Sequence, residues 1–225
     1  MFLNILFTSP VLALVWAVAI FISLTIHEFS HALMGSLRGD KTAEREGRLT
    51  LNPLAHIDLF GLIPLLLFGF GWAKPVPFNP YNLKNPKWDS VAIALAGPGA
   101  NLLLLILAAV GFRFAFSILG VTNLLTVFFF FLVLLNLFLL FFNIIPIHPL
   151  DGSKLFFALF DDPKYAKARA FVAIRGPQLL MVAVVLAVLT NINVFFFISE
   201  PAYGVCHGLI GKNCIGYFSA VFSTL

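Results

Sequence analysis

The sequence predicts an all-α integral membrane protein with about four transmembrane helices and a re-entrant hairpin between the first and the second. The chain of 225 residues is 60% hydrophobic and only 11% charged, which is outside the usual composition of water-soluble domains. Its long apolar runs approach or exceed the roughly 20 residues that a helix needs to cross about 30 Å of hydrocarbon. These runs place the four spans at about residues 5–36, 90–113, 121–143 and 176–198.

A fifth apolar segment, at about residues 59–73, is too short to cross a bilayer. It contains Pro64 and several glycines, so we expect it to enter the membrane and return on the same side. The polar connectors are all shorter than about 25 residues, too short to form a domain of their own. We therefore expect residues 1–225 to form a single membrane-embedded domain.

Two connectors have the pattern of extended chain. Residues 48–51, with the sequence RLTL, alternate polar and apolar side chains as an edge strand does. Residues 73–90 contain several prolines and should be extended or polyproline-like. Extended segments can pair their backbone with another chain, so either RLTL or residues 76–80 could hold an unwound substrate.

The basic residues predict the orientation. With the amino terminus outside, all of the 14 Lys and Arg except Arg113 and Lys212 fall in inner connectors, as the positive-inside rule requires. We therefore expect a multi-pass protein of the cell membrane with its active site towards the cytoplasm. Cys206 and Cys214 then lie outside, where they either form a disulfide or remain as two free thiols. The sequence shows no basic stripe with interleaved aromatics, which argues against binding to nucleic acid.

His27, Glu28 and His31 form the motif HEFSH at the end of the first span. Residues four apart project from the same face of a helix, so the two imidazoles can bind one metal ion, and Glu28 beside them can take a proton from water. An ionisable group at bilayer depth is unfavourable by roughly 2.5 kcal/mol or more, a cost that bound zinc would offset. The alternative, histidines that only hydrogen-bond at the membrane interface, leaves Glu28 without a role.

A catalytic zinc ion usually has three protein ligands, so a third one is needed. Asp151 is the best candidate because it follows a helix break caused by two prolines and precedes Gly152, which permits close backbone approach. The alternative is that Asp151 only caps the helix that follows. Asn101 lies in an apolar span and also requires a partner there.

These motifs resemble those of the site-2 protease family of intramembrane zinc metalloproteases. The resemblance rests on HEFSH in the first span, AGPGAN in the second, NIIPIHPLDG after the third and GWAKPVPFNP after the hairpin. It covers most of the chain and is to the compact branch of the family, which lacks PDZ and CBS domains.

The resemblance implies that Zn2+ is bound by His27, His31 and Asp151. It also implies that Glu28 is the catalytic base and that Asn143 binds substrate or stabilises the oxyanion. The implied activity is an endopeptidase that hydrolyses peptide bonds in or near transmembrane segments, as in regulated intramembrane proteolysis. The implied partners are a transmembrane substrate protein and the lipid bilayer; the sequence does not define an oligomeric state.

The remaining histidines receive other interpretations. His148 stands where related sequences often carry a nonpolar residue or proline. It could contact a metal ligand or serve as a spare ligand, but we favour a solvated loop residue, because nothing fixes its direction. His56 is interpreted as structural or interfacial, and His207 lies on the outer side, away from the chemistry.

Two other functions fit the same residues. A catalytically silent scaffold could bind membrane helices, but it would not need Glu28. A zinc transporter could use the same ligands, but transport requires access from both faces, whereas these residues cluster towards the inner one.

Overall fold

The structure, a computed structural model, describes residues 6–68, 71–190 and 192–224. Most of these residues are helical, and the pairing outside helices is limited, in these ranges, to one isolated bridge between Ile57 and Ala73. The helices are α2 (Pro10–Leu37), α3 (Thr42–Arg45), η1 (Pro53–Ala55), α4 (Leu59–Phe68), η2 (Pro80–Asn82), α5 (Pro86–Leu119), α6 (Leu124–Asn143), α7 (Gly152–Leu159), η3 (Pro163–Tyr165), α8 (Ala166–Leu189), α9 (Phe196–Ile210) and α10 (Cys214–Thr224).

Four helices are long and apolar enough to cross a membrane, which confirms the predicted fold class. They are α2, α5, α6 and α8, the last together with the η3 turn before it. The first three match the predicted spans to within about six residues. Residue 5, where the first span was expected to begin, lies outside the described ranges.

The fourth span lies about ten residues earlier than predicted. We expected it at residues 176–198, whereas α8 covers Ala166–Leu189. The charges of Lys167, Arg169 and Arg175 favoured a connector at these positions, but long basic side chains can extend from a helix into water. The helix ends at Leu189 with Thr190 as its C-cap, and residue 191 of the predicted span is outside the described part of the chain.

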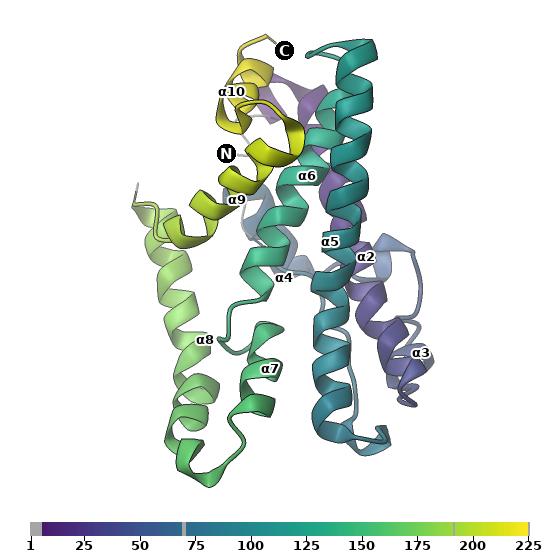
Figure 1. Cartoon of the computed structure of the whole chain (residues 1–225), viewed down its shortest axis with the longest axis vertical. Helices are drawn as coiled ribbons and strands as arrows, with labels where there is room; N and C mark the ends of the chain where they lie inside the picture. Colours follow the sequence, from purple (N-terminus) through teal and green to yellow (C-terminus); the bar gives the residue numbers. More distant parts are fainter. Residues whose placement is uncertain (1–5, 69–70, 191, 225) are drawn as a thin grey trace.

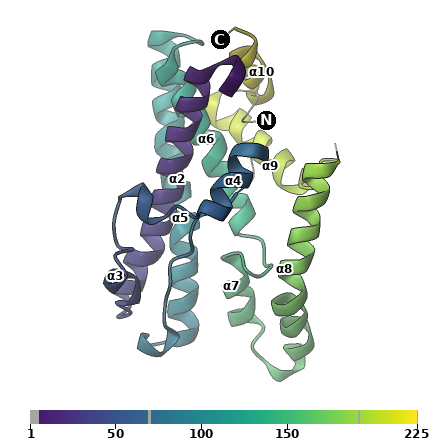
Figure 2. The same ribbon diagram turned by 180° about the vertical axis from the view of Figure 1, so that it is seen from behind.

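Helices α2, α5 and α6 form the body of the protein and run side by side along its long axis (Figure 1). Helix α5 packs against both of the others, and α2 also packs against α6. Helix α8 stands apart from this group in both views (Figures 1 and 2). Gly176 is its one buried residue among those described, and the backbone of His148 lies directly against it.

The ends of the spanning helices are set by local sequence. Asn85 caps α5 by accepting a hydrogen bond from the Trp88 N–H, and Pro86 occupies the first turn, where a missing N–H has no cost. Gly120 ends α5 with a φ of 83°, a conformation that favours glycine. Asn123 then caps α6 through the Leu125 N–H.

Polar contacts connect the C-terminal end of α2 with the N-terminal end of α5. The Arg38 guanidinium pairs with Asp89 at 3.3 Å. The buried Asp40 carboxylate accepts hydrogen bonds from Thr42, Asn79 and Asn82. Burial alone would raise the pKa of Asp40, but these hydrogen bonds lower it, so the carboxylate stays charged. Asp40 therefore fixes the chain between α4 and α5 against the end of α2.

The apolar segment between the first two spans turns back on itself. Helix α4 is followed by a return of the chain, because Ala73 pairs with Ile57 and the Lys74 N–H donates to the His56 carbonyl at 2.8 Å. Leu59, Phe60 and Ile63 are exposed on α4. Residues 69–70 lie outside the described ranges, and entry of this segment into the bilayer remains our prediction.

Of the two connectors predicted to be extended, one agrees with the structure and the other does not. Residues 49–51 form bends and Arg48 has no regular structure, so the predicted RLTL edge strand is wrong. The reason is that Arg48 turns inward and donates to the carbonyls of Lys74 and Pro75 instead of alternating with its neighbours. Residues 74–79 have neither helix nor strand, as their proline content predicts.

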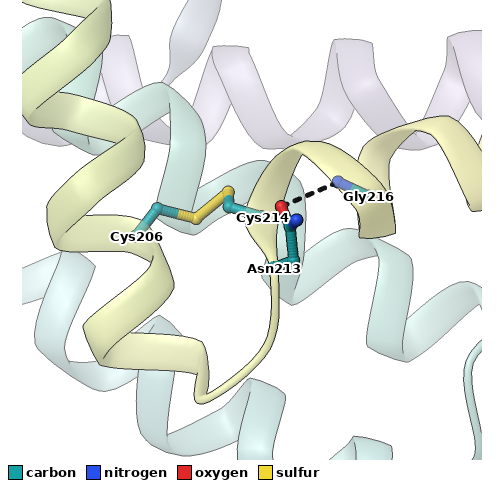
Figure 3. The surroundings of a disulfide bond; sticks show 4 residues. All are labelled: Cys206, Asn213, Cys214 and Gly216. Atoms are coloured by element: carbon teal, nitrogen blue, oxygen red, sulfur yellow. Dashed lines mark hydrogen bonds between the residues drawn. A yellow bond between two sulfur atoms is a disulfide. The ribbon is translucent and has the colours of Figure 1, made fainter.

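The carboxyl-terminal residues, which the sequence indicated only as an outer tail, form α9 and α10. Cys206 and Cys214 form a disulfide between these two helices (Figure 3), which decides between the two alternatives above. Tyr217 of α10 packs its ring on Phe130 and donates its hydroxyl to the Val121 carbonyl. The two helices thereby pack against the C-terminal part of α5 and against α6.

Replacing both cysteines by serine should lower the stability of the outer end without affecting the inner half. The cross-link spans eight residues, for which the chain-entropy model gives a loss of about 2–3 kcal/mol. Thermal unfolding of the purified protein in detergent should show a lower Tm, and alkylation before and after reduction should detect the two thiols. An unchanged Tm, or thiols that react without reduction, would contradict this assignment.

Candidate metal centre

His27 and His31 lie on the buried face of α2, one helical turn apart. Their exposed fractions are 4% and 8%, and the Nε2 atoms of the two rings are 3.0 Å apart. The sequence places them on one helical face because residues i and i+4 project in the same direction. Both rings therefore present a nitrogen to the same point in space.

Asp151 reaches the same point from the loop after α6. Its Oδ2 lies 3.3 Å from the Nε2 atom of His27 and 3.3 Å from that of His31. Asp151 occupies the residue before the first turn of α7, yet its side chain makes no capping hydrogen bond. The structure therefore does not support the alternative in which Asp151 only caps this helix.

Gly152 allows the loop to bring Asp151 to this position. A Cβ atom at residue 152 would lie 2.2 Å from the Ile144 carbonyl oxygen, so only glycine fits here. The break between α6 and α7 contains Pro146 and Pro149, neither of which can donate a helical hydrogen bond. The sequence prediction of close backbone approach at Gly152 is thus confirmed.

Hydrogen bonds fix which nitrogen of each ring faces the centre. The Nδ1 atom of His27 contacts the Asn101 Oδ1, and that of His31 contacts the Ile93 carbonyl oxygen at 2.7 Å. Both partners can only accept, so each neutral ring carries its proton on Nδ1 and its lone pair on Nε2. Asn101 thus has the polar partner that its place in an apolar helix required.

The arrangement fits a metal ion. Three lone-pair atoms converge at 3.0–3.3 Å, and the buried Oδ2 of Asp151 makes no regular hydrogen bond among the described residues. Without a cation these atoms would repel one another. Ligands about 2.0–2.1 Å from a tetrahedral ion are about 3.3 Å apart, which is close to the observed spacing. Within the described ranges, this is also the one group of three His, Cys, Asp or Glu side chains that could hold a metal ion.

Glu28 is buried beside this group without belonging to it. Its exposed fraction is 8%, and the three converging ligand atoms come from other residues. A carboxylate in this position can exchange a proton with a molecule bound next to the histidines. Glu28 is therefore placed as the sequence motif predicts for a base, and its role remains a proposal.

Gly97 of α5 packs directly against both imidazole rings, a contact that the sequence did not predict. A Cβ atom there would lie 2.4 Å from the Nε2 of His31 and 2.6 Å from the Cε1 of His27. The motif AGPGAN in this helix is rich in small residues, which permit close helix contacts. Their presence signalled a close approach, but not that the approaching groups are the two histidines.

Access to the centre is from the side of Asp151. The Asp151 side chain is 21% exposed, whereas the histidine side chains are nearly enclosed. A separate small cavity between α2 and α4 has mostly apolar walls, including Phe21, Leu24 and Leu62, and the ligand atoms are not part of it. A reacting molecule would therefore enter past the α6–α7 loop.

Asn143 and the three remaining histidines do not contribute atoms to this group. Asn143 donates its side-chain N–H to the Leu139 carbonyl at 3.0 Å, within the last turn of α6. His56 is buried and its Nε2 contacts the Thr50 carbonyl, a structural position that agrees with our interpretation. His148 is half-buried, and burial together with the nearby Lys154 lowers its pKa. His207 is exposed on α9 at the outer end.

The fold and the site together define a helical membrane protein with a buried His-His-Asp metal centre. Residues 118–183 match the family model for peptidase family M50, a region that includes Asp151 and Asn143. The chain is 40% identical over 146 residues to the protein named Putative zinc metalloprotease YwhC of Bacillus subtilis, covering 61% of this chain and 65% of that one. It is 37% identical over 90 residues to Putative zinc metalloprotease Rip2 of Mycolicibacterium smegmatis, covering 38% and 34%.

In residues 118–183 the chain is thus similar to peptidase family M50, and over longer stretches it is similar to two proteins named as zinc metalloproteases. The chain spans less than two thirds of the length of either relative. No solved structure matches it.

Proposed function

We propose that this protein is an intramembrane zinc endopeptidase that hydrolyses peptide bonds in or near transmembrane segments of other membrane proteins. The observation that carries the proposal is the convergence of three lone-pair atoms on one buried point with a carboxylate beside it. The match of residues 118–183 to peptidase family M50 and the names of both relatives support the same activity.

Three residues would hold the metal: His27, His31 and Asp151. Zn2+ at this position supplies a Lewis acid and lowers the pKa of water from about 15.7 towards 7. Glu28 accepts the proton of the attacking water and later returns it to the leaving amine. Because Glu28 and both histidines lie on consecutive turns of α2, the proton acceptor and the metal ligands keep a fixed spacing.

Asn143 is proposed to contact the substrate. One N–H of its amide is used by the Leu139 carbonyl, but an amide nitrogen has two N–H groups. The second can donate to a substrate carbonyl or to the developing oxyanion. The position of Asn143, at the end of α6 where the loop to Asp151 begins, supports this role.

We propose that the site faces the cytoplasm. The disulfide lies at the outer end with α10, whereas the connectors that contain most of the basic residues lie towards the other end (Figure 1). Disulfides persist in oxidising compartments, and basic connectors stay in the cytoplasm. These two independent signals support the same orientation in the cell membrane.

The substrate is proposed to be a transmembrane helix that unwinds locally. The carbonyls of an intact helix are hydrogen-bonded and are not open to attack. The extended residues 74–79 run past the end of α2, but several of their polar backbone groups already bind Arg48 and Asp40. RLTL is not a strand, so of the two segments considered for strand addition only the extended one after α4 remains a candidate for holding the substrate.

Metal analysis combined with a cleavage assay tests this function. We expect wild-type protein to bind about one zinc ion per chain and to cleave a membrane-helix substrate, and chelation should stop cleavage. Asp151→Ala should bind zinc at least about 100-fold more weakly than wild type. This loss exceeds the one expected when only a hydrogen-bonding partner of a metal ligand is removed. Asp161→Ala, which removes an exposed carboxylate just beyond α7, is the matched control and should behave as wild type.

The outcome also separates the two rival functions. Zinc binding without cleavage of any membrane-helix substrate would indicate a silent scaffold. Zinc flux into liposomes without peptidase activity would indicate a transporter. Either result would overturn the proposed function.

A further inference from the structure

A continuous chain of buried polar side chains runs from His27 across α5 and α6 and back to α2. It consists of Asn101, Asn136 and Ser23, each of them fully buried. Amides and hydroxyls are costly in an apolar helix bundle unless they are hydrogen-bonded. The chain ends at the histidine ring that faces the metal centre, which suggests a purpose beyond helix packing.

Every hydrogen bond in this chain has a fixed direction. The Ser23 hydroxyl donates to the Ala19 carbonyl at 2.8 Å, so its oxygen can only accept from the Asn136 Nδ2 at 2.9 Å. That same Nδ2 also donates to the Leu132 carbonyl at 2.8 Å. Both interactions require the amide nitrogen of Asn136 to face Ser23 and the Leu132 carbonyl. The Oδ1 of Asn136 must therefore face Asn101.

The orientation of the Asn136 amide determines the orientation of Asn101, and through it the position of the proton on His27. The Asn136 Oδ1 accepts from the Asn101 Nδ2 at 2.6 Å, which leaves the Asn101 Oδ1 facing the ring. An amide oxygen can only accept, so the His27 proton must be on Nδ1 and the lone pair on Nε2. If Asn101 rotated by half a turn, its N–H would face Nδ1, and the ring proton would move to Nε2, where it would block metal binding.

We propose that Asn136 is a positioning residue that selects the metal-binding tautomer of His27 through Asn101. Ser23 assists by fixing the amide orientation of Asn136. This inference rests on the zinc site of the proposed function. It assigns a role to a side chain of α6 that does not touch the metal ligands.

Zinc affinity measured by competition with a chromophoric chelator tests the proposal, with the full chain in detergent and Zn2+ alone as the probe. Asn136→Leu keeps the volume but removes the amide, and we expect about tenfold weaker binding or more, in the range of outer-partner substitutions. Thr126→Val is the matched control, because Thr126 is equally buried on α6 and its hydroxyl has no hydrogen-bonding partner among the described residues. The control should bind zinc as tightly as wild type.

A second variant distinguishes orientation from packing. Asn136→Asp, neutral at this depth, keeps an oxygen acceptor for Asn101 and an O–H donor for Ser23, so its zinc affinity should remain within about threefold of wild type. Two outcomes would overturn the proposal. In the first, Asn136→Leu lowers the Tm but binds zinc as tightly as the control Thr126→Val. In the second, Asn136→Asp binds zinc as weakly as Asn136→Leu.

If Asn136→Leu does not fold, Ser23→Ala decides: weaker zinc binding supports the relay and unchanged binding overturns it. Wild-type protein that binds no zinc would instead overturn the metal site itself, so the two failures are distinguishable.

Discussion

Replacing Gly97 by alanine is expected to weaken zinc binding strongly, and with it every activity that depends on the metal. The added methyl carbon would lie 2.4 Å from the Nε2 of His31 and 2.6 Å from the Cε1 of His27, far inside van der Waals contact. Neither ring can retreat without breaking its hydrogen bond to α5, because His27 is held by Asn101 and His31 by the Ile93 carbonyl. We expect zinc affinity to fall by at least about 100-fold, more than the loss of a single outer partner.

The matched control for this variant lies two residues further along the same helix. A Cβ atom at Gly99 would meet no atom within 4 Å, so Gly99→Ala should preserve zinc affinity and, through its better helix propensity, slightly raise stability. Equilibrium zinc titration and thermal unfolding of both variants would check the prediction. Wild-type zinc affinity in Gly97→Ala would show that the histidines are not packed against α5 as described.

Glu28→Gln is expected to lower peptidase activity by about 10³-fold and to leave zinc binding intact. General acid–base catalysis contributes roughly 10²–10⁴-fold, and glutamine has the shape of glutamate but cannot accept the proton. The ligand atoms belong to other residues, so the metal site should assemble normally. Cleavage of a membrane-helix substrate and metal content per chain are the two measurements.

Glu46→Gln provides the corresponding control, because Glu46 is exposed in the connector after α3. It should cleave at the wild-type rate. Loss of zinc from Glu28→Gln would make this carboxylate a ligand rather than a base, and undiminished cleavage would remove it from the mechanism.

The sequence was sufficient to predict the features that depend on local pattern. Apolar length predicted α2, α5 and α6, and the i, i+4 spacing predicted that His27 and His31 share a face. Asp151 could be selected because a proline-rich break and Gly152 identified a non-helical loop at depth. Each of these inferences concerns a short stretch whose physical requirements do not depend on its neighbours.

Features that depend on which helices meet were not predictable in the same way. A lone Asn136 in an apolar helix indicates that some partner exists, but not that the partner is Asn101. Gly97 indicates a close approach without naming the approaching side chain. The bounds of α8 were misplaced because its basic first turns are polar, and α9 and α10 were missed because each is shorter than the apolar stretch that a membrane span needs.

The distance in sequence between the ligands has a consequence for biosynthesis. Two of them are in the first span and the third is at residue 151, after two further crossings. A ribosome-bound chain that has inserted only α2 and α5 therefore has both imidazoles but no carboxylate to complete the set. We expect such a nascent chain to be hydrolytically silent, so that the translocation machinery and its other clients are not exposed to an active protease before synthesis has passed that aspartate.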